Sequence, residues 1–217
     1  MTLDAEVAMR KIGIPVVHAV TNDDVLARPD FIDVACAVMH VLGARGALHL
    51  RASRLPGGRF QSLAEGLAAA QGLTGGWLIV NDRLDVALAS GARGVQLTST
   101  SLETSDAKRI APLLALGASV HDVSAGRTAA AAGADWLVAG QVFATQGNTR
   151  SPAWVHTLVN ATTVPVVAIG GVRVEHAAAL RALGVHGVAV IRGIWDATNA
   201  EQAASDYLSA YDSAGAV

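Results

Sequence analysis

The chain has 217 residues and a formal net charge of −2, so it offers no basic field that would attract nucleic acid phosphates or anionic lipid. Charged residues make up only 16% of it, against roughly 25% in an average soluble domain, and we expect much of the chain to be buried. No charge-free apolar run reaches the roughly 18 residues that a membrane span needs, and residues 1–10 lack the layout of a signal peptide. We therefore expect a cytoplasmic protein that binds neither nucleic acid nor membrane.

Short apolar segments recur along the chain, most of them after an alanine-rich helical stretch that stops at a glycine. Glycine accepts the left-handed backbone that ends a helix, and a strand follows within a few residues. These joins, together with one apolar segment near each end of the chain, predict eight strands separated by helices. The predicted strands lie within residues 15–20, 43–50, 76–80, 91–97, 117–121, 133–139, 165–169 and 184–190.

Eight strand-then-helix units at this chain length predict a single (β/α)8 TIM barrel, with residues 1–217 as one domain. Residues 77–80 and 164–169 are continuously apolar, as expected for strands that are covered on both faces. The alternative is an open doubly wound sheet. The sequence favours it less, because it has neither GxGxxG after the first strand nor a Walker-type glycine loop with lysine.

Polar residues follow the predicted strands, at the barrel face that carries the active site in proteins of this fold. Arg51 could reach an anionic ligand there, since its guanidinium matches a carboxylate or a phosphate. We expect the polar residues to form a ring around a ligand. In chain order they are His18, Thr21, His49, Arg51, Asn81, Asp82, Gln96, Thr98, His121, Gln141 and Thr145.

Two glycine-containing turns predict a phosphate site. Gly170 and Gly171 follow the seventh predicted strand, and residues Ile191, Arg192 and Gly193 follow the eighth. Backbone N–H groups can approach an anion closely where side chains are small, and many such barrels hold a phosphate at these two loops. The alternative reading is that the two glycines only permit a tight turn.

His121 is the predicted proton-transfer residue, because it closes the fifth strand and imidazole gains and loses a proton near neutral pH. His18 and His49 could instead be hydrogen-bonded core residues, and their roles stay open. His176 falls on a predicted helix. Asp82 could bind a metal or simply cap a helix, and without a recognisable metal motif we predict neither metal nor cofactor.

These strand ends together resemble the thiamine phosphate synthase and TenI superfamily over nearly the whole chain. The order and spacing of several segments carry the resemblance, which implies a phosphorylated thiazole as ligand and suggests a homodimer. The matching segments are residues 49–51, 79–88, 94–97, 119–121, 140–145 and 168–172.

The two branches of that superfamily differ in chemistry. Synthases join a pyrimidine pyrophosphate to a thiazole phosphate with Mg²⁺, and their pattern has a lysine after the strand-two arginine, an acidic metal ligand after strand four and a lysine after the strand-six threonine. Here those places hold residues 51–54 (Arg-Ala-Ser-Arg), 98–100 (Thr-Ser-Thr) and 145–148 (Thr-Gln-Gly-Asn). The sequence therefore looks closer to TenI, whose enzymatic members are thiazole tautomerases that aromatise a carboxythiazole phosphate.

The resemblance to TenI assigns proton transfer to His121 and phosphate binding to Gly170, Gly171 and Arg192. By the same analogy, Arg51 and Asn81 would orient the thiazole ring or its carboxylate. Two alternatives stay open: a TenI-like protein that binds its ligand without turnover, for regulation, and a divergent thiamine phosphate synthase.

Overall fold

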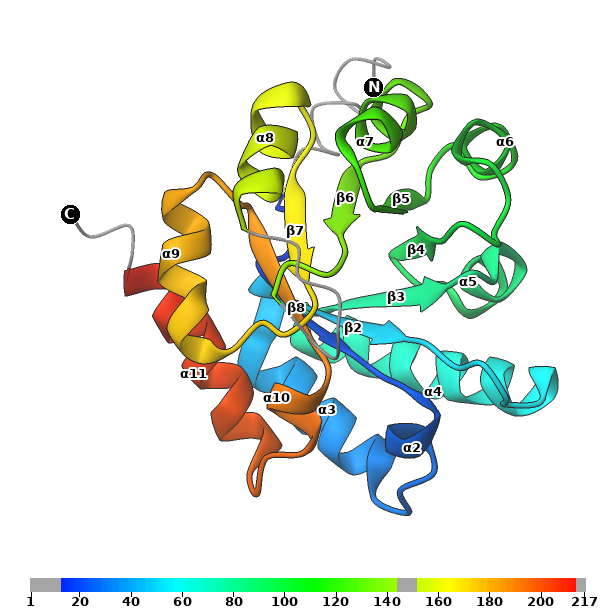
Figure 1. The fold of residues 1–217 in the computed structure, drawn as a ribbon. Helices are drawn as coiled ribbons and strands as arrows, with labels where there is room; N and C mark the ends of the chain where they lie inside the picture. Colours follow the sequence, from blue (N-terminus) through cyan, green and yellow to red (C-terminus); the bar gives the residue numbers. More distant parts are fainter. Residues whose placement is uncertain (1–12, 144–151, 214–217) are drawn as a thin grey trace.

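The computed structural model describes residues 13–143 and 152–213, which form a closed barrel of parallel strands surrounded by helices (Figure 1). Each strand pairs with the next one along the chain, and β8 pairs with β1 to close the barrel. The (β/α)8 prediction is confirmed. The strands are β1 Val17–Val20, β2 Gly46–Leu50, β3 Trp77–Asn81, β4 Gly94–Leu97, β5 Ala115–Val120, β6 Trp136–Ala139, β7 Val166–Ile169 and β8 Gly187–Val190.

Helices cover the outside of the barrel (Figure 1). None of the helices within the described ranges is both long and apolar enough to cross a membrane. The helices are α2 Asp23–Leu26, α3 Phe31–Leu42, η1 Gly43–Arg45, α4 Gly57–Thr74, α5 Leu84–Ser90, α6 Thr104–Ile110, α7 Val123–Ala131, α8 Ala153–Ala161, η2 Val174–His176, α9 Ala177–Ala182, α10 Arg192–Trp195 and α11 Ala200–Ser213, with η for 3-10 helices.

The glycines at the predicted joins have positive φ angles, as expected for residues that end a helix. The φ angles of Gly43, Gly91, Gly133 and Gly184 are 53°, 74°, 97° and 81°. A side chain at such an angle is strained, so glycine is what allows a helix to stop there and the chain to turn into the next strand.

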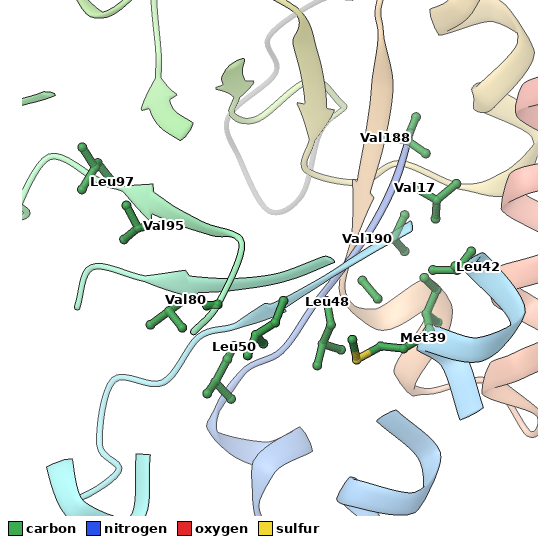
Figure 2. Close-up of a cluster of buried hydrophobic side chains, with 14 of the residues drawn as sticks. Val17, Met39, Leu42, Leu48, Leu50, Val80, Val95, Leu97, Val188 and Val190 are labelled. Carbon is green, nitrogen blue, oxygen red and sulfur yellow. The ribbon is translucent and has the colours of Figure 1, made fainter. Parts of the chain in front are cut away.

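Side chains alternate between two apolar layers, because successive residues of a strand point to opposite faces. On β2, Leu48 and Leu50 point outward and pack in the same cluster as Met39 and Leu42 of α3 (Figure 2). The inward-facing layer fills the barrel with the side chains of Val20, Ala47, Ile79, Trp136, Val138, Val167 and Ala189. This alternation also turns His18, His49 and Asn81 toward the barrel interior.

Gly117 makes room for the indole of Trp136 inside the barrel. A Cβ atom on Gly117 would lie 2.2 Å from the indole of Trp136 and 2.3 Å from Oε1 of Gln96. Without that atom, the indole Nε1–H donates to Gln96 Oε1 at 3.0 Å, and the Gln96 amide in turn donates to Ser119 Oγ at 3.0 Å. Hydrogen bonds from Trp136 to Gln96 and from Gln96 to Ser119 therefore connect the apolar core of the barrel with its polar mouth.

Candidate active site

A cavity of about 760 Å³ opens above the C-terminal ends of β7 and β8. All five residues predicted to bind phosphate line it: Gly170, Gly171, Ile191, Arg192 and Gly193. Gly170 and Gly171 have φ angles of 104° and 65°, so both backbone positions favour glycine. Helix α10 begins at Arg192, and the first N–H groups of a helix have no partner inside it. The cavity is therefore bordered by backbone groups suited to an anion.

The cavity is also lined by residues that were not predicted to belong to a site. His176 was expected only on a helix, but it lines the cavity together with Phe143, and their rings stack at 3.9 Å between centroids. His176 Nδ1 accepts a hydrogen bond from the backbone N–H of Arg173 at 3.1 Å. The uncharged ring then carries its proton on Nε2 and can donate from there. Its position five residues after Gly171 is the only sequence signal that pointed to this loop.

His121 lies at the mouth, directly after β5, and its side chain is exposed. It is not among the residues that line the 760 Å³ cavity. The loop after β6 connects the two places: Gly140 lies against the His121 imidazole, and the Cα of Gln141 would contact a Cβ on Gly170 at 2.9 Å. Phe143, two residues further along, lines the cavity. Predicted residue Thr145 lies outside the described residues.

The remaining predicted ligand contacts, Arg51 and Asn81, follow β2 and end β3. Arg51 is half-buried, and its backbone is fixed by Thr21, whose hydroxyl accepts from the Arg51 N–H at 2.8 Å and donates to its carbonyl at 2.9 Å. Asn81 is 7% exposed and contacts His49 inside the barrel. Both residues are at the mouth of the barrel, as predicted, but neither lines the 760 Å³ cavity.

The family resemblance raises a Mg²⁺ site near Asp82, and the neighbouring side chains do not fit one. Asp82 Oδ1 accepts hydrogen bonds from the hydroxyls of Thr98 and Ser101, each at 2.5 Å. Magnesium is held by carboxylates and waters in near-octahedral geometry. The residues that follow β4 therefore donate hydroxyl hydrogen bonds to the carboxylate of Asp82. A Mg²⁺ site of the synthase pattern would need a second carboxylate in their place.

The fold and the cavity define a class: a (β/α)8 barrel with a glycine-bordered cavity at the C-terminal ends of its last two strands. Within that class, residues 17–194 match the family described as thiamine monophosphate synthase. The chain belongs to this family.

Two relatives of similar length bear the synthase name. A thiamine-phosphate synthase of Methanoculleus marisnigri is 37% identical over 182 residues, which cover 80% of this chain and 86% of that protein. A thiamine-phosphate synthase of Herpetosiphon aurantiacus is 33% identical over 199 residues, covering 89% and 95%. A solved structure, thiamine phosphate pyrophosphorylase from Pyrococcus furiosus, superposes with a TM-score of 0.83 at 29% identity and covers 92% of this chain and 96% of that one.

These comparisons confirm the superfamily but not the choice of branch made from the sequence. The relatives just described carry the name that the synthase alternative predicted, and they give no support to the TenI branch specifically. A decision between the branches depends on the side chains of this chain.

Proposed function

We propose that this member of the thiamine monophosphate synthase family is a thiazole tautomerase, which aromatises a carboxythiazole phosphate by metal-independent proton transfer. The observation that supports this most is the environment of Asp82. Its carboxylate accepts hydrogen bonds from Thr98 and Ser101, at the place where the synthase pattern has a second acidic metal ligand. A site built in this way suits chemistry that needs no cation.

The reaction moves one proton and one double bond. A base removes a proton from a ring carbon, and the electron pair of that C–H bond forms a new ring double bond. The existing ring double bond shifts by one position toward the carbon that carries the exocyclic double bond, and the electron pair of the exocyclic double bond takes up a proton at its far carbon. The substrate loses and gains one proton, so no oxidant or reductant is consumed. His121 can perform both transfers because its exposed imidazole can accept a proton and return it.

The rest of the ligand would be held by groups that line the cavity and by other residues at the mouth of the barrel. Backbone N–H groups of Gly170, Gly171 and Gly193, with Ile191 and the Arg192 guanidinium, would bind the phosphate. Arg51, Asn81, Gln141 and Thr145 would contact the thiazole ring and its carboxylate. His121 approaches the cavity through Gly140 and Gln141, so the ligand would extend from the phosphate loops toward the end of β5.

Thiamine phosphate synthase is the second candidate, and the names and identities of the relatives favour it. It requires this chain to couple the pyrimidine and thiazole halves with Mg²⁺. Binding without turnover is the third reading.

We expect the protein to act in the cytoplasm as a homodimer.

The test is a pair of assays on the purified full chain. In one, the carboxythiazole tautomer is supplied alone and the aromatic product is followed. In the other, thiazole phosphate and pyrimidine pyrophosphate are supplied with Mg²⁺, and thiamine phosphate is followed. If product forms in the first assay and not in the second, the proposal is supported. If product forms in the second assay and not in the first, the protein is a synthase. Binding of the ligand without product in either assay establishes the third reading.

A further inference from the structure

A hydrogen-bonded chain of polar side chains runs through the barrel interior, and the proposed mechanism gives its two histidines no role. His18 Nε2 lies 2.8 Å from the carbonyl oxygen of Pro15, and His18 Nδ1 lies 2.8 Å from His49 Nε2. At the other end, His49 Nδ1 lies 3.3 Å from the Oδ1 position of Asn81. Since Asn81 is the last residue of β3, the chain of contacts climbs from the N-terminal end of the barrel to its mouth.

The number of protons available to this series of hydrogen bonds decides which end of the Asn81 side-chain amide faces His49. The three contacts need one proton each, and two uncharged imidazoles supply only two. The carbonyl of Pro15 can only accept, so His18 carries its proton on Nε2 and its Nδ1 accepts from His49 Nε2–H. His49 Nδ1 is then a bare acceptor, and an oxygen of Asn81 facing it would leave that contact without a proton.

The histidine pair stays uncharged because of where it lies. His18 is fully buried and His49 is 2% exposed. Burial lowers the pKa of His18 to about 4, with a smaller opposing effect of the Pro15 carbonyl and a small lowering by His186. Burial and the neighbouring His18 hold the pKa of His49 well below its ordinary value.

Among residues 13–143 and 152–213, no other side chain that faces the barrel interior supplies a charge that would compensate an imidazolium. Side chains that face the barrel interior from the other strands are uncharged, and they include Gln96, Ser119, Trp136, Val138, Val167 and Ala189. The charged residues nearest in sequence to these contacts are Arg51, which follows β2, and Asp82 and Arg83, which follow β3. Asp82 is engaged by Thr98 and Ser101, and Arg83 pairs with Asp85.

We propose that the His18–His49 pair is a positioning device that holds the Asn81 amide with its NH₂ group toward His49 and its carbonyl oxygen toward the mouth of the barrel. The two ends of an amide have nearly the same shape, so the turned side chain occupies the same space. The Asn81 carbonyl oxygen then accepts a hydrogen bond from the ligand. The ligand group that this position selects is an N–H or O–H donor. The ligand part of the proposal rests on the proposed function, and it assigns the substrate carboxylate to Arg51 rather than to Asn81.

Nitrogen-15 NMR of the histidine side chains in the full chain tests the orientation without any ligand. We expect both rings to be uncharged and protonated on Nε2, with His49 Nδ1 hydrogen-bonded to the side-chain NH₂ of Asn81. In Asn81→Leu, the tautomers should persist while the His49 Nδ1 signal moves to that of an unbonded nitrogen. A His49 ring protonated on Nδ1, or an imidazolium at neutral pH, would overturn the proposal.

Calorimetry with paired thiazole phosphates tests the ligand preference. The two members of each pair carry an amino or a methyl group at the same ring position, so they differ in hydrogen-bond donation more than in size. For the pair whose substituted ring position lies next to Asn81, we expect the amino compound to bind about 3- to 10-fold more tightly than the methyl compound, as one net hydrogen bond allows. Asn81→Leu and His49→Phe should each remove that preference and still bind the methyl compound.

The two experiments separate this proposal from the proposed function. A preference for the amino compound that survives in Asn81→Leu, or equal binding of every pair by the wild-type protein, would refute the assigned selectivity. If no thiazole phosphate binds at all, the proposed function fails, while the NMR result still decides how Asn81 is held.

Discussion

The imidazole of His121 lies so close to Gly140 that a Cβ atom on Gly140 would come within 2.9 Å of Cε1 and 3.0 Å of Nδ1. Gly140 follows β6, and its backbone N–H donates to the Val120 carbonyl at 3.1 Å. The end of β6 therefore sets the position of the side chain that follows β5.

Gly140→Ala should displace the His121 imidazole and lower tautomerase turnover by about 10- to 100-fold, since small misplacements of reacting groups are costly. The added methyl meets a side chain that can rotate away, so the melting temperature should change little. Steady-state rates and thermal unfolding of the same preparation check both statements. Unchanged turnover would mean that the position of His121 does not matter for the reaction.

Gly171→Ala should weaken thiazole phosphate binding. Gly171 has a φ of 65°, and a Cβ there would lie 3.0 Å from both Cβ and the carbonyl oxygen of Phe143. The matched control is Gly91→Ala, because Gly91 has a φ of 74° with nothing within 4 Å of the added atom. Both variants should lose about 1 kcal/mol of stability from the backbone strain alone.

Only Gly171→Ala should also lower the affinity for thiazole phosphate in calorimetry, because only Gly171 borders the cavity. Equal affinity of the two variants for thiazole phosphate would contradict the placement of the phosphate at this loop.

The fold was predictable because its signals are local and repeat along the chain. Each strand is a short apolar run, and the joins carry glycines whose left-handed φ angles the structure confirms. The five residues predicted to bind phosphate line one cavity, since loops after consecutive strands of a barrel meet at one face.

Contacts between distant residues were not predictable in the same way. The sequence places His18 and His49 on separate strands, and only the register of β1 and β2 brings their rings within hydrogen-bond distance. His176 was assigned to a helix face, whereas a short 3-10 turn carries it into the cavity. The paired hydroxyls of Thr98 and Ser101 on Asp82 likewise depend on how the loop after β4 folds back toward β3.

Stability should fall as the pH decreases from about 6.5 toward 4. The pKa of His18 is lowered from 6.5 to about 4 in the folded state, chiefly by burial, so in this window the unfolded chain binds a proton that the folded chain does not. The contribution of His18 is fully present above pH 6.5 and amounts to about 3 kcal/mol; the lowered pKa of His49 acts in the same direction.

Urea unfolding across this pH range measures the effect. The double variant His18→Gln, His49→Gln has no group that titrates at these positions, and its stability should depend less on pH than that of the wild-type protein. Parallel pH profiles for the two proteins would show that the buried pair does not cause the loss.

Tautomerase activity should be unaffected by EDTA. The hydroxyls of Thr98 and Ser101 engage Asp82 Oδ1, and the proposed proton transfer needs no Lewis acid. Steady-state rates with EDTA and with added Mg²⁺ should agree within error. Activity that EDTA abolishes and Mg²⁺ restores would contradict the proposed chemistry and favour the synthase.

His121→Asn tests the central claim most directly. Asparagine keeps some hydrogen bonding at the end of β5 but cannot relay a proton, so the rate of aromatic product formation from the carboxythiazole tautomer should fall by about 10² to 10⁴-fold, or about 3 to 5 kcal/mol of barrier lowering. Affinity for thiazole phosphate should change much less, because the proposed phosphate contacts are in the loops after β7 and β8. A variant that binds normally and turns over at the wild-type rate would contradict the assignment of proton transfer to His121.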